Sequence, residues 1–218
     1  MVIDDLDLSS ASVFLDFDGT ISLGDTGVHL LNRLAGDSWR AIEELYASGE
    51  IGSRECITRQ WALLATEDES RLRSVAAEIP IDDYFEPLVD ALLDAGAEVS
   101  IVSDGFGFVA SDVGESMGIA VKTATIDWAT GAIAFPDGDE TCLCARCGTC
   151  KQAPLREAAG RGRTTIFVGD GLSDQLAAPG ADLLFATDQL ARWCDLQNIP
   201  YRPFLSLGEV AAALGLLG

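Results

Sequence analysis

The sequence is poor in positive charge, and only two of its 218 residues are lysines, Lys122 and Lys151. Lysine and arginine together number 14, against 35 aspartate and glutamate residues, which leaves a formal net charge of -21. Such an acidic surface repels polyanions, so we expect neither nucleic acid nor an anionic membrane as a partner. An anionic substrate would therefore need a local group of positive charges.

Histidine and long apolar segments are also scarce. The single histidine, His29, lies on an apolar helix face, so we expect no histidine-based mechanism. No apolar run reaches the roughly 18 residues of a membrane-spanning helix. The first residues are acidic, whereas a secretion signal begins with basic residues. These absences favour a cytoplasmic protein, in which the six cysteines would stay reduced.

Strand and helix patterns alternate along most of the chain. Short apolar runs that end in polar turns predict buried strands at residues 12–17, 98–103, 164–168 and 181–186. Helical patterns follow the last two of these runs, at residues 173–179 and 189–196. This alternation predicts an α/β fold, with a parallel sheet that has helices on both faces.

Residues 24–79 break this alternation, because they contain helical patterns and no strand pattern. Ser53 and Asp68 are the predicted N-caps of two of these helices. We therefore predict a small helical cap, residues 24–79, inserted after the first strand of a core that comprises residues 1–23 and 80–218. Residues 124–135 contain a Thr-Gly turn and predict a hairpin.

Aspartates follow two of the predicted strands. Asp16 and Asp18 stand at the end of the first strand, and the alternation of a strand points both to the same side. Asp170 and Asp174 follow a later strand. If both strand ends lie at one edge of the sheet, four carboxylates converge there and repel one another. A divalent cation relieves this repulsion, and all-oxygen ligands favour Mg²⁺.

A lone Asp-x-Asp-Gly motif would be explained as turn and N-cap residues, but further features accompany this one. Ser103 ends the second predicted strand, and Lys151 is one of the two lysines. A hydroxyl, a lysine and a glycine-loosened backbone provide what is needed to anchor a phosphate in an acidic site. The candidate phosphate-binding residues are Ser103, Asp104, Gly105 and Lys151.

These residues together resemble a known family. The segment from Asp16 to Thr20, then Ser103, Lys151 and the pair Asp170 and Asp174, match in order the four motifs of the haloacid dehalogenase superfamily phosphatases. The resemblance implies a Rossmann-like core and a cap placed between the first two motifs. It also implies hydrolysis of a small-molecule phosphate monoester through an aspartyl-phosphate intermediate.

The resemblance also implies a role for each motif residue. Asp16 would be the nucleophile, and Asp18 would act first as general acid and then as general base. Mg²⁺ would be bound by Asp16, by the carbonyl oxygen of Asp18 and by Asp170, with Asp174 as a direct or outer-shell ligand. The metal, Ser103 and Lys151 would neutralise the transferring phosphoryl group.

Within the superfamily, the chain is most similar to the phosphoserine-phosphatase-like branch. The segment 48–55 and the run Cys147-Gly-Thr-Cys-Lys151 resemble the 2-hydroxy-3-keto-5-methylthiopentenyl-1-phosphate phosphatases of methionine salvage. Phosphoethanolamine/phosphocholine phosphatases also have cysteines before this lysine. Asp104 stands where many relatives have glycine, which argues against phosphoserine as the substrate.

Several alternatives stay open at this point. The chain is a methionine-salvage-type phosphatase, a phosphoserine- or phosphoethanolamine-type phosphatase, a phosphotransferase, or a regulatory binding protein on the same fold. A receiver domain of two-component signalling fits less well, because its acidic pair and its phosphorylated aspartate lie on different strands. Asp16 and Asp18 share one strand end.

Two smaller features have alternative interpretations. Four of the six cysteines lie close together in the sequence: Cys142, Cys144, Cys147 and Cys150. They predict either a structural zinc site or a compact reduced loop beside the active site. The reduced loop is favoured, because zinc sites usually have two separate cysteine pairs. Arg54 and Arg59 are either solvated helix residues or contacts for a substrate carboxylate or phosphate when the cap closes.

Overall fold

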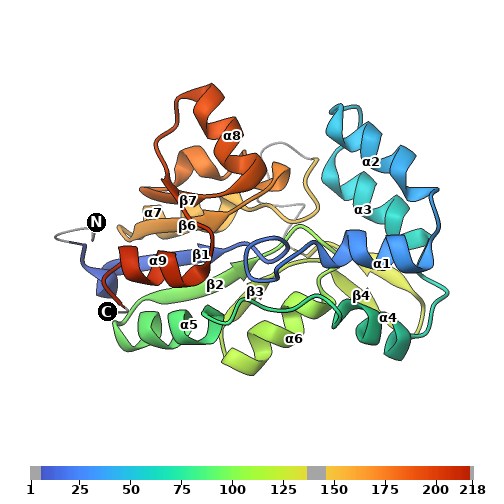
Figure 1. The fold of residues 1–218 in the computed structure, drawn as a ribbon, viewed down its shortest axis with the longest axis horizontal. Coiled ribbons are helices and arrows are strands. Elements are labelled where there is room, and N and C mark those ends of the chain that lie inside the picture. The colour runs from blue at the N-terminus through green and yellow to red at the C-terminus, as the bar shows by residue number, and fades with distance from the viewer. Residues whose placement is uncertain (1–5, 137–145, 217–218) are drawn as a thin grey trace.

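The computed structural model describes residues 6–136 and 146–216. Its centre is a six-stranded parallel sheet in the order β3-β2-β1-β6-β7-β8 (Figure 1). A short 3₁₀ helix, η1 (Leu8–Ser10), precedes the sheet, whose strands are β1 (Ala11–Leu15), β2 (Glu98–Val102), β3 (Ala120–Lys122), β6 (Thr164–Gly169), β7 (Leu183–Ala186) and β8 (Arg202–Pro203). The expected α/β fold is confirmed, whereas strands β3 and β8 are too short to leave an apolar run in the sequence.

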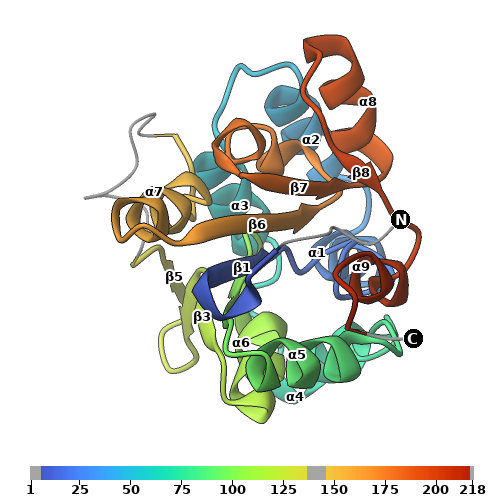
Figure 2. The same cartoon turned by 90° about the vertical axis from the view of Figure 1, so that its left-hand side faces the viewer.

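Helices cover both faces of the sheet (Figures 1 and 2). The helices α5 (Phe85–Asp94), α6 (Phe108–Met117) and α9 (Leu207–Ala213) pack on one face, and α7 (Gln152–Gly160) and α8 (Asp188–Gln197) pack on the other. In β1, Val13 and Leu15 contact the first layer, and Phe14 contacts the second. A strand buried on both faces has a nearly continuous run of apolar side chains, which β1 shows apart from the buried Ser12.

Four helices form the region that follows β1: α1 (Thr26–Leu34), α2 (Trp39–Ala47), α3 (Ser53–Ala62) and α4 (Glu69–Ala76). They lie beyond the carboxyl ends of the strands, at the right of Figure 1. Leu30, Trp61 and Leu72 belong to an apolar cluster between these helices that is separate from the two clusters of the sheet. We keep the division into a cap, 24–79, and a core, 1–23 and 80–218, as a proposal.

The predicted hairpin is present as β4 (Thr125–Asp127) and β5 (Ala132–Ala134), but it packs against the cap helices. Trp128 lies edge-on to Trp61, with ring centroids 6.1 Å apart. The Trp61 indole Nε1 donates a hydrogen bond of 2.8 Å to the carbonyl of Gly131 in the hairpin turn. A second segment, remote from the cap in sequence, therefore holds the cap in place.

The structure differs from two local predictions. Residues 173–179 contain two 3₁₀ turns, η2 (Leu172–Asp174) and η3 (Ala178–Gly180), in place of one helix. The Pro179-Gly180 pair breaks helices, and the Asp174 carboxylate binds the backbone of the preceding turn. Asp68 caps α4 as expected, but Gly52 is the N-cap of α3, and Ser53 is its first residue. Across the described ranges, the helices lack the length and apolar character required to span a bilayer.

Candidate active site

A cavity of about 220 Å³ lies between the carboxyl ends of the central strands and the cap. Asp16 and Asp18 line it after β1, Asp104 and Gly105 after β2, and Asp170 after β6. Ligands bind at this edge of parallel sheets, because the carboxyl ends of the strands and the following turns meet there. The topology thus brings together the carboxylates that the sequence places on separate strands.

Asp16 is almost fully buried at the end of β1. Its Oδ1 lies 2.6 Å from the Lys151 Nζ and accepts a 2.7 Å hydrogen bond from the Phe17 amide. Burial raises the pKa of Asp16 well above its ordinary value, and the charge of Asp174 raises it further, while Lys151 opposes both effects. The described contacts of the Asp16 carboxylate thus fall on Oδ1.

Asp18 is held by Thr26, the first residue of α1. Both the amide and the hydroxyl of Thr26 donate to Asp18 Oδ1, at 2.8 and 2.6 Å. Burial raises the pKa of Asp18, and the two Thr26 hydrogen bonds limit the increase. The sequence patterns do not identify Thr26 as a site residue. The available signal is its position directly after Asp25, whose side chain caps α1. An acid with a raised pKa is suited to carrying a proton near neutral pH.

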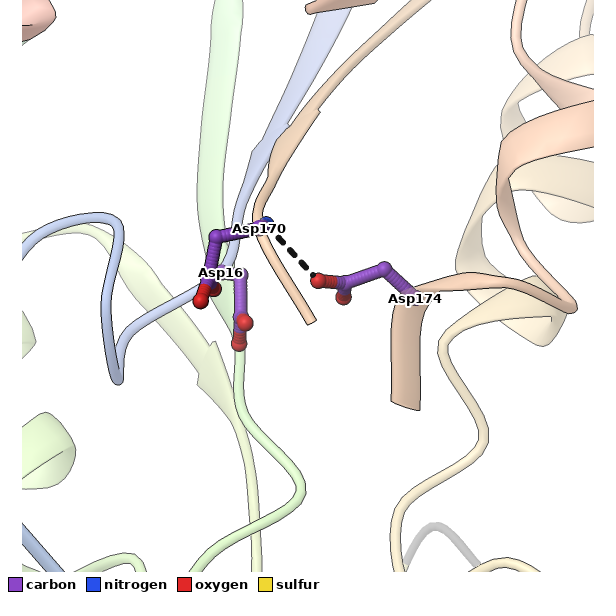
Figure 3. A group of neighbouring side chains, drawn as sticks. All are labelled: Asp16, Asp170 and Asp174. Carbon is purple, nitrogen blue, oxygen red and sulfur yellow. Dashed lines mark hydrogen bonds between the residues drawn. The ribbon is translucent and has the colours of Figure 1, made fainter. Parts of the chain in front are cut away.

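Lys151 lies between two buried carboxylates, with Nζ 2.6 Å from Asp16 Oδ1 and 2.6 Å from Asp174 Oδ1. Although burial favours the neutral amine, these ion pairs raise the pKa of Lys151 above its ordinary value. Asp174 Oδ2 also accepts hydrogen bonds from the amides of Asp170, at 3.0 Å, and Gly171, at 2.9 Å. Figure 3 shows Asp174 approaching Asp16 and Asp170 from the opposite side. Asp174 thus fixes both the lysine and the turn after β6.

Asp170 lies beside Asp16, and the pair fits a metal ion. Carboxylate oxygens of Asp16, Asp170 and Asp174 all lie within 4.8 Å of one another (Figure 3), an all-oxygen set of the kind that Mg²⁺ prefers. Burial, followed by the charge of Asp174, raises the pKa of Asp170 to about 7, whereas the charge of Lys151 lowers it. Gly19 has a φ of +81°, and a Cβ there would lie 2.3 Å from Asp170 Oδ2, so only glycine permits this approach.

The candidate phosphate-binding residues after β2 lie at the same edge. Ser103 is buried, and its amide donates to the Lys122 carbonyl at 2.9 Å. Gly105 lines the cavity next to Asp18. The Asp104 carboxylate accepts a 2.7 Å hydrogen bond from the Thr149 amide. Burial raises the pKa of Asp104, whereas hydrogen bonds from Ser53 and Thr149 lower it.

The start of α3 joins the cap to the segment that precedes Lys151, and we call this contact the cap–loop junction: Gly49, Gly52, Ser53, Arg54, Asp104 and residues 146–149. The Ser53 hydroxyl accepts a 3.0 Å hydrogen bond from the Gly148 amide. A Cβ on Gly52 would lie 2.3 Å from the Arg146 carbonyl, so the chains touch at backbone distance. This junction explains why Ser53 does not cap its own helix.

The two cap arginines have protein partners. The Arg54 Nε donates to the Cys147 carbonyl at 3.2 Å, and its guanidinium lies over the Phe135 ring. Arg59 forms an ion pair with Glu55 on the same helix. Neither is among the described residues that line the cavity at the strand ends, although both line a second pocket together with Arg146. Arg59 is therefore a solvated helix residue, whereas Arg54 is packed against the loop, and a substrate contact of either arginine stays a prediction.

The cysteine-rich run is only partly described. Cys142 and Cys144 lie outside the described residues. Cys150 is buried beside Lys151, and Cys147 belongs to the cap–loop junction. The alternatives of a zinc site and a reduced loop stay predictions.

The sequence can now be compared with known proteins. The haloacid dehalogenase-like hydrolase family model matches residues 13–179. The chain belongs to this family. This hydrolase is 27% identical over 214 residues to a 2-hydroxy-3-keto-5-methylthiopentenyl-1-phosphate phosphatase of Bacillus velezensis, and the match covers 94% of this chain and 90% of the relative. A phosphatase of the same name from an Exiguobacterium species is 24% identical over 208 residues, with 93% and 96% covered.

Solved structures confirm the fold of this hydrolase. A phosphoserine phosphatase with a phospho-aspartyl intermediate analogue superimposes with a TM-score of 0.72 at 19% identity, covering 93% of this chain and 98% of that one. A phosphoserine phosphatase from T. onnurineus gives a TM-score of 0.70 at 17% identity, covering 98% of each chain. The expected superfamily is confirmed, and so is the expected enzyme class, a phosphoric monoester hydrolase.

Proposed function

We propose that this hydrolase removes phosphate from a small-molecule monoester through an aspartyl-phosphate on Asp16. The supporting observation is the buried cluster in which Asp16, Lys151 and Asp174 share 2.6 Å ion pairs beside Asp170. Three motifs that are remote in sequence supply one carboxylate for attack, one cation and two further carboxylates. A purely structural cluster would not need this arrangement to line a cavity.

In the first step, Asp16 Oδ2 attacks phosphorus, and the bond from phosphorus to the ester oxygen breaks. Asp18 donates its proton to the leaving oxygen, so that the product leaves as a neutral alcohol. The hydrogen bonds from Thr26 to Oδ1 orient Asp18 so that Oδ2 carries this proton. Lys151 holds the attacking carboxylate in place and offsets its negative charge.

In the second step, Asp18 takes a proton from water, and the hydroxide attacks phosphorus. The bond from phosphorus to Asp16 breaks, which releases phosphate and restores the carboxylate. Asp16, Asp170 and the Asp18 carbonyl would hold Mg²⁺, which supplies positive charge to the phosphate oxygens when bound. Ser103, Lys151 and the backbone of Asp104 and Gly105 would bind the remaining phosphate oxygens.

The substrate that we propose first is the one named for the relatives, 2-hydroxy-3-keto-5-methylthiopentenyl-1-phosphate. Two such relatives match over nine-tenths or more of both chains, whereas the phosphoserine phosphatases are similar in fold at less than 20% identity. Identity of 24–27% also leaves related phosphate esters open as substrates.

The test is hydrolysis of p-nitrophenyl phosphate by the wild type with Mg²⁺, by the wild type with EDTA, and by the Asp16→Asn variant. We expect turnover that requires Mg²⁺ and falls by about a thousandfold or more in Asp16→Asn, because the amide is not a nucleophile. The melting temperature of the variant should show that the fold survives. Near-full activity of Asp16→Asn would refute the proposal.

The remaining alternatives are separated in the same assay. A phosphotransferase would release less inorganic phosphate than p-nitrophenol when an acceptor alcohol is added, whereas a hydrolase releases equal amounts. A regulatory binding protein would show no turnover of any phosphate ester and no phosphate on Asp16 after treatment with acetyl phosphate.

A further inference from the structure

The cavity has a second wall that faces the proposed nucleophile. It is built by α2 and α3 of the cap and consists of Glu43, Tyr46, Cys56, Ile57 and Gln60. A phosphate bound at Asp16 directs the alcohol part of its ester away from the strand ends and towards this wall. The composition of the wall therefore bears on which alcohols can be bound.

Negative charge dominates the lining of the cavity. Among the described lining residues there is no lysine, arginine or histidine, whereas six are acidic: Asp16, Asp18, Asp25, Glu43, Asp104 and Asp170. Lys151 lies behind Asp16 and is already paired with Asp16 and Asp174. The phosphate would be neutralised by Lys151 and the metal. A second anionic group on the substrate would then face the remaining carboxylates of the lining, and like charges repel.

Glu43 is the charged member of the cap wall, and its position is fixed by its neighbours. Its Oε2 accepts a 2.8 Å hydrogen bond from the Gln60 amide and lies 3.8 Å from the Cys56 Sγ. Burial and the charge of Glu43 raise the pKa of Cys56 to about 12, so the thiol stays protonated and donates. Both described contacts fall on Oε2, which leaves Oε1 to accept a hydrogen bond from a bound molecule.

We propose that this wall selects phosphate monoesters whose alcohol part carries no second anionic group and presents a hydroxyl or ammonium donor to Glu43. The inference rests on the proposed phosphatase activity and narrows its substrate class. It disfavours phosphoserine, which carries a carboxylate, and it admits phosphoethanolamine and uncharged hydroxylated esters. Glu43 is then a specificity-determining residue that acts on the leaving group.

Matched pairs of substrates test the two halves of this proposal. Phosphoethanolamine and phosphoserine differ by one carboxylate, and we expect kcat/KM to be about tenfold or more lower for phosphoserine. Propyl phosphate and 3-hydroxypropyl phosphate differ by one hydroxyl, and the hydroxylated ester should be preferred severalfold. Comparing 3-hydroxypropyl phosphate with phosphoethanolamine shows whether the preferred donor is a hydroxyl or an ammonium.

Variants then assign the selectivity to Glu43. Glu43→Gln should reduce both the discrimination against phosphoserine and the preference for esters that carry a hydroxyl or ammonium donor. Ile57→Arg should reduce the discrimination against phosphoserine, because it adds a cation to the wall. Glu44→Gln is the matched control, because Glu44 is the exposed neighbour on the same helix. Circular dichroism and melting temperatures check that each variant is folded.

The outcomes separate this proposal from the one on which it rests. Hydrolysis of p-nitrophenyl phosphate without discrimination within either pair would overturn the selectivity and leave the phosphatase activity intact. Equal profiles for Glu43→Gln and Glu44→Gln would remove Glu43 from the explanation. Absence of Mg²⁺-dependent turnover of every ester would refute the phosphatase itself, and this inference with it.

Discussion

Lys151 is the residue on which the buried charges of the site depend. Its ammonium group contacts carboxylates that follow two different strands, Asp16 after β1 and Asp174 after β6. The ion pairs therefore join the nucleophile to the turn that carries Asp170. Because all three partners are nearly inaccessible to water, removing one leaves a charge that the solvent cannot compensate.

We expect Lys151→Met to be destabilised by roughly 3–5 kcal/mol in the absence of metal, because two buried carboxylates lose their cation. The loss should be larger at pH 8 than at pH 5. Without the lysine, the folded-state pKa of Asp16 rises further above its unfolded value near 3.9, so folding is increasingly disfavoured as the pH rises between the two. Urea unfolding in EDTA at both pH values measures this. Lys122→Met, which changes the other lysine, is the control, and an equal effect of both variants would contradict the expectation.

Asp170 allows metal binding to be tested without an activity assay. Mg²⁺ should raise the melting temperature of the wild type, because a ligand bound only by the folded state stabilises it by about 2.7 kcal/mol at 100 times its Kd. In Asp170→Asn the increase should be largely lost, because one carboxylate of the candidate metal-binding group becomes an amide. NaCl at equal ionic strength is the control. A full Mg²⁺ response of Asp170→Asn would place the metal elsewhere.

The motif residues could be predicted from the sequence, whereas the residues that support them could not. Asp16 and Asp18 stand in a short pattern beside a strand end, Lys151 is one of two lysines in an acidic chain, and their chemistry suggests their use. Thr26 and Glu43 carry no such pattern, because their roles depend on where the cap helices lie relative to the strands. Only the tertiary structure gives that placement.

At the scale of the elements, α3 is attached to the core at its first turn. Its N-terminal residues contact residues 146–149 through the Ser53 hydroxyl and through the Arg54 amide, which donates to the Arg146 carbonyl at 3.2 Å. The same loop continues into Lys151 and α7. The start of α3 and the loop that leads to Lys151 are therefore joined by one set of hydrogen bonds.

We expect Ser53→Ala to lower the free energy of unfolding by about 1–3 kcal/mol, because the buried Gly148 amide loses its acceptor. We also expect kcat for p-nitrophenyl phosphate to fall, since the loop before Lys151 becomes less fixed. Urea unfolding and steady-state kinetics measure the two effects. Ser48→Ala, at an exposed serine shortly before α3, should change stability by less than about 0.5 kcal/mol. Equal unfolding midpoints for the two variants would argue against the junction.

The elements show where sequence patterns are informative. The Thr-Gly turn predicts the hairpin, but nothing in its short strands indicates that Trp128 packs on the cap helices. Residues 173–179 carry a helical pattern, yet the hydrogen bonds of Asp174 and the Pro179-Gly180 pair divide them into two 3₁₀ turns. Local patterns specify local structure, and a buried carboxylate can override them.

For the whole molecule, the net charge of -21 acts against folding. Repulsion between exposed carboxylates is screened by salt, because the Debye length falls from about 30 Å at 0.01 M to about 3 Å at 1 M. We therefore expect the melting temperature to rise steadily when NaCl increases from 0.01 to 1 M at pH 7.5 in EDTA. Differential scanning fluorimetry measures it. A melting temperature that falls over this range would show that attractive ion pairs outweigh the repulsion.

The overall architecture could be predicted more fully than any other level. Alternating strand and helix patterns specify a parallel sheet, and the helical stretch after β1 specifies an insertion. The order of the strands does not follow from these patterns, and β3 and β8 have too few residues to be recognised. From the sequence, Asp16 and Asp170 are predicted to converge only if their strands end at the same edge of the sheet. The parallel pairing of β1 with β6 meets this condition.

The central position of β1 also has a consequence for how the protein is made. β1 pairs with β2 on one side and with β6 on the other, and β6 ends at Gly169. On the ribosome, β1 emerges before β6, and one edge of β1 stays unpaired until the chain has been synthesised as far as β6. Asp170 and Asp174 are translated only after that point. We expect nascent chains to lack any metal site, so that activity arises in a single late event of biosynthesis.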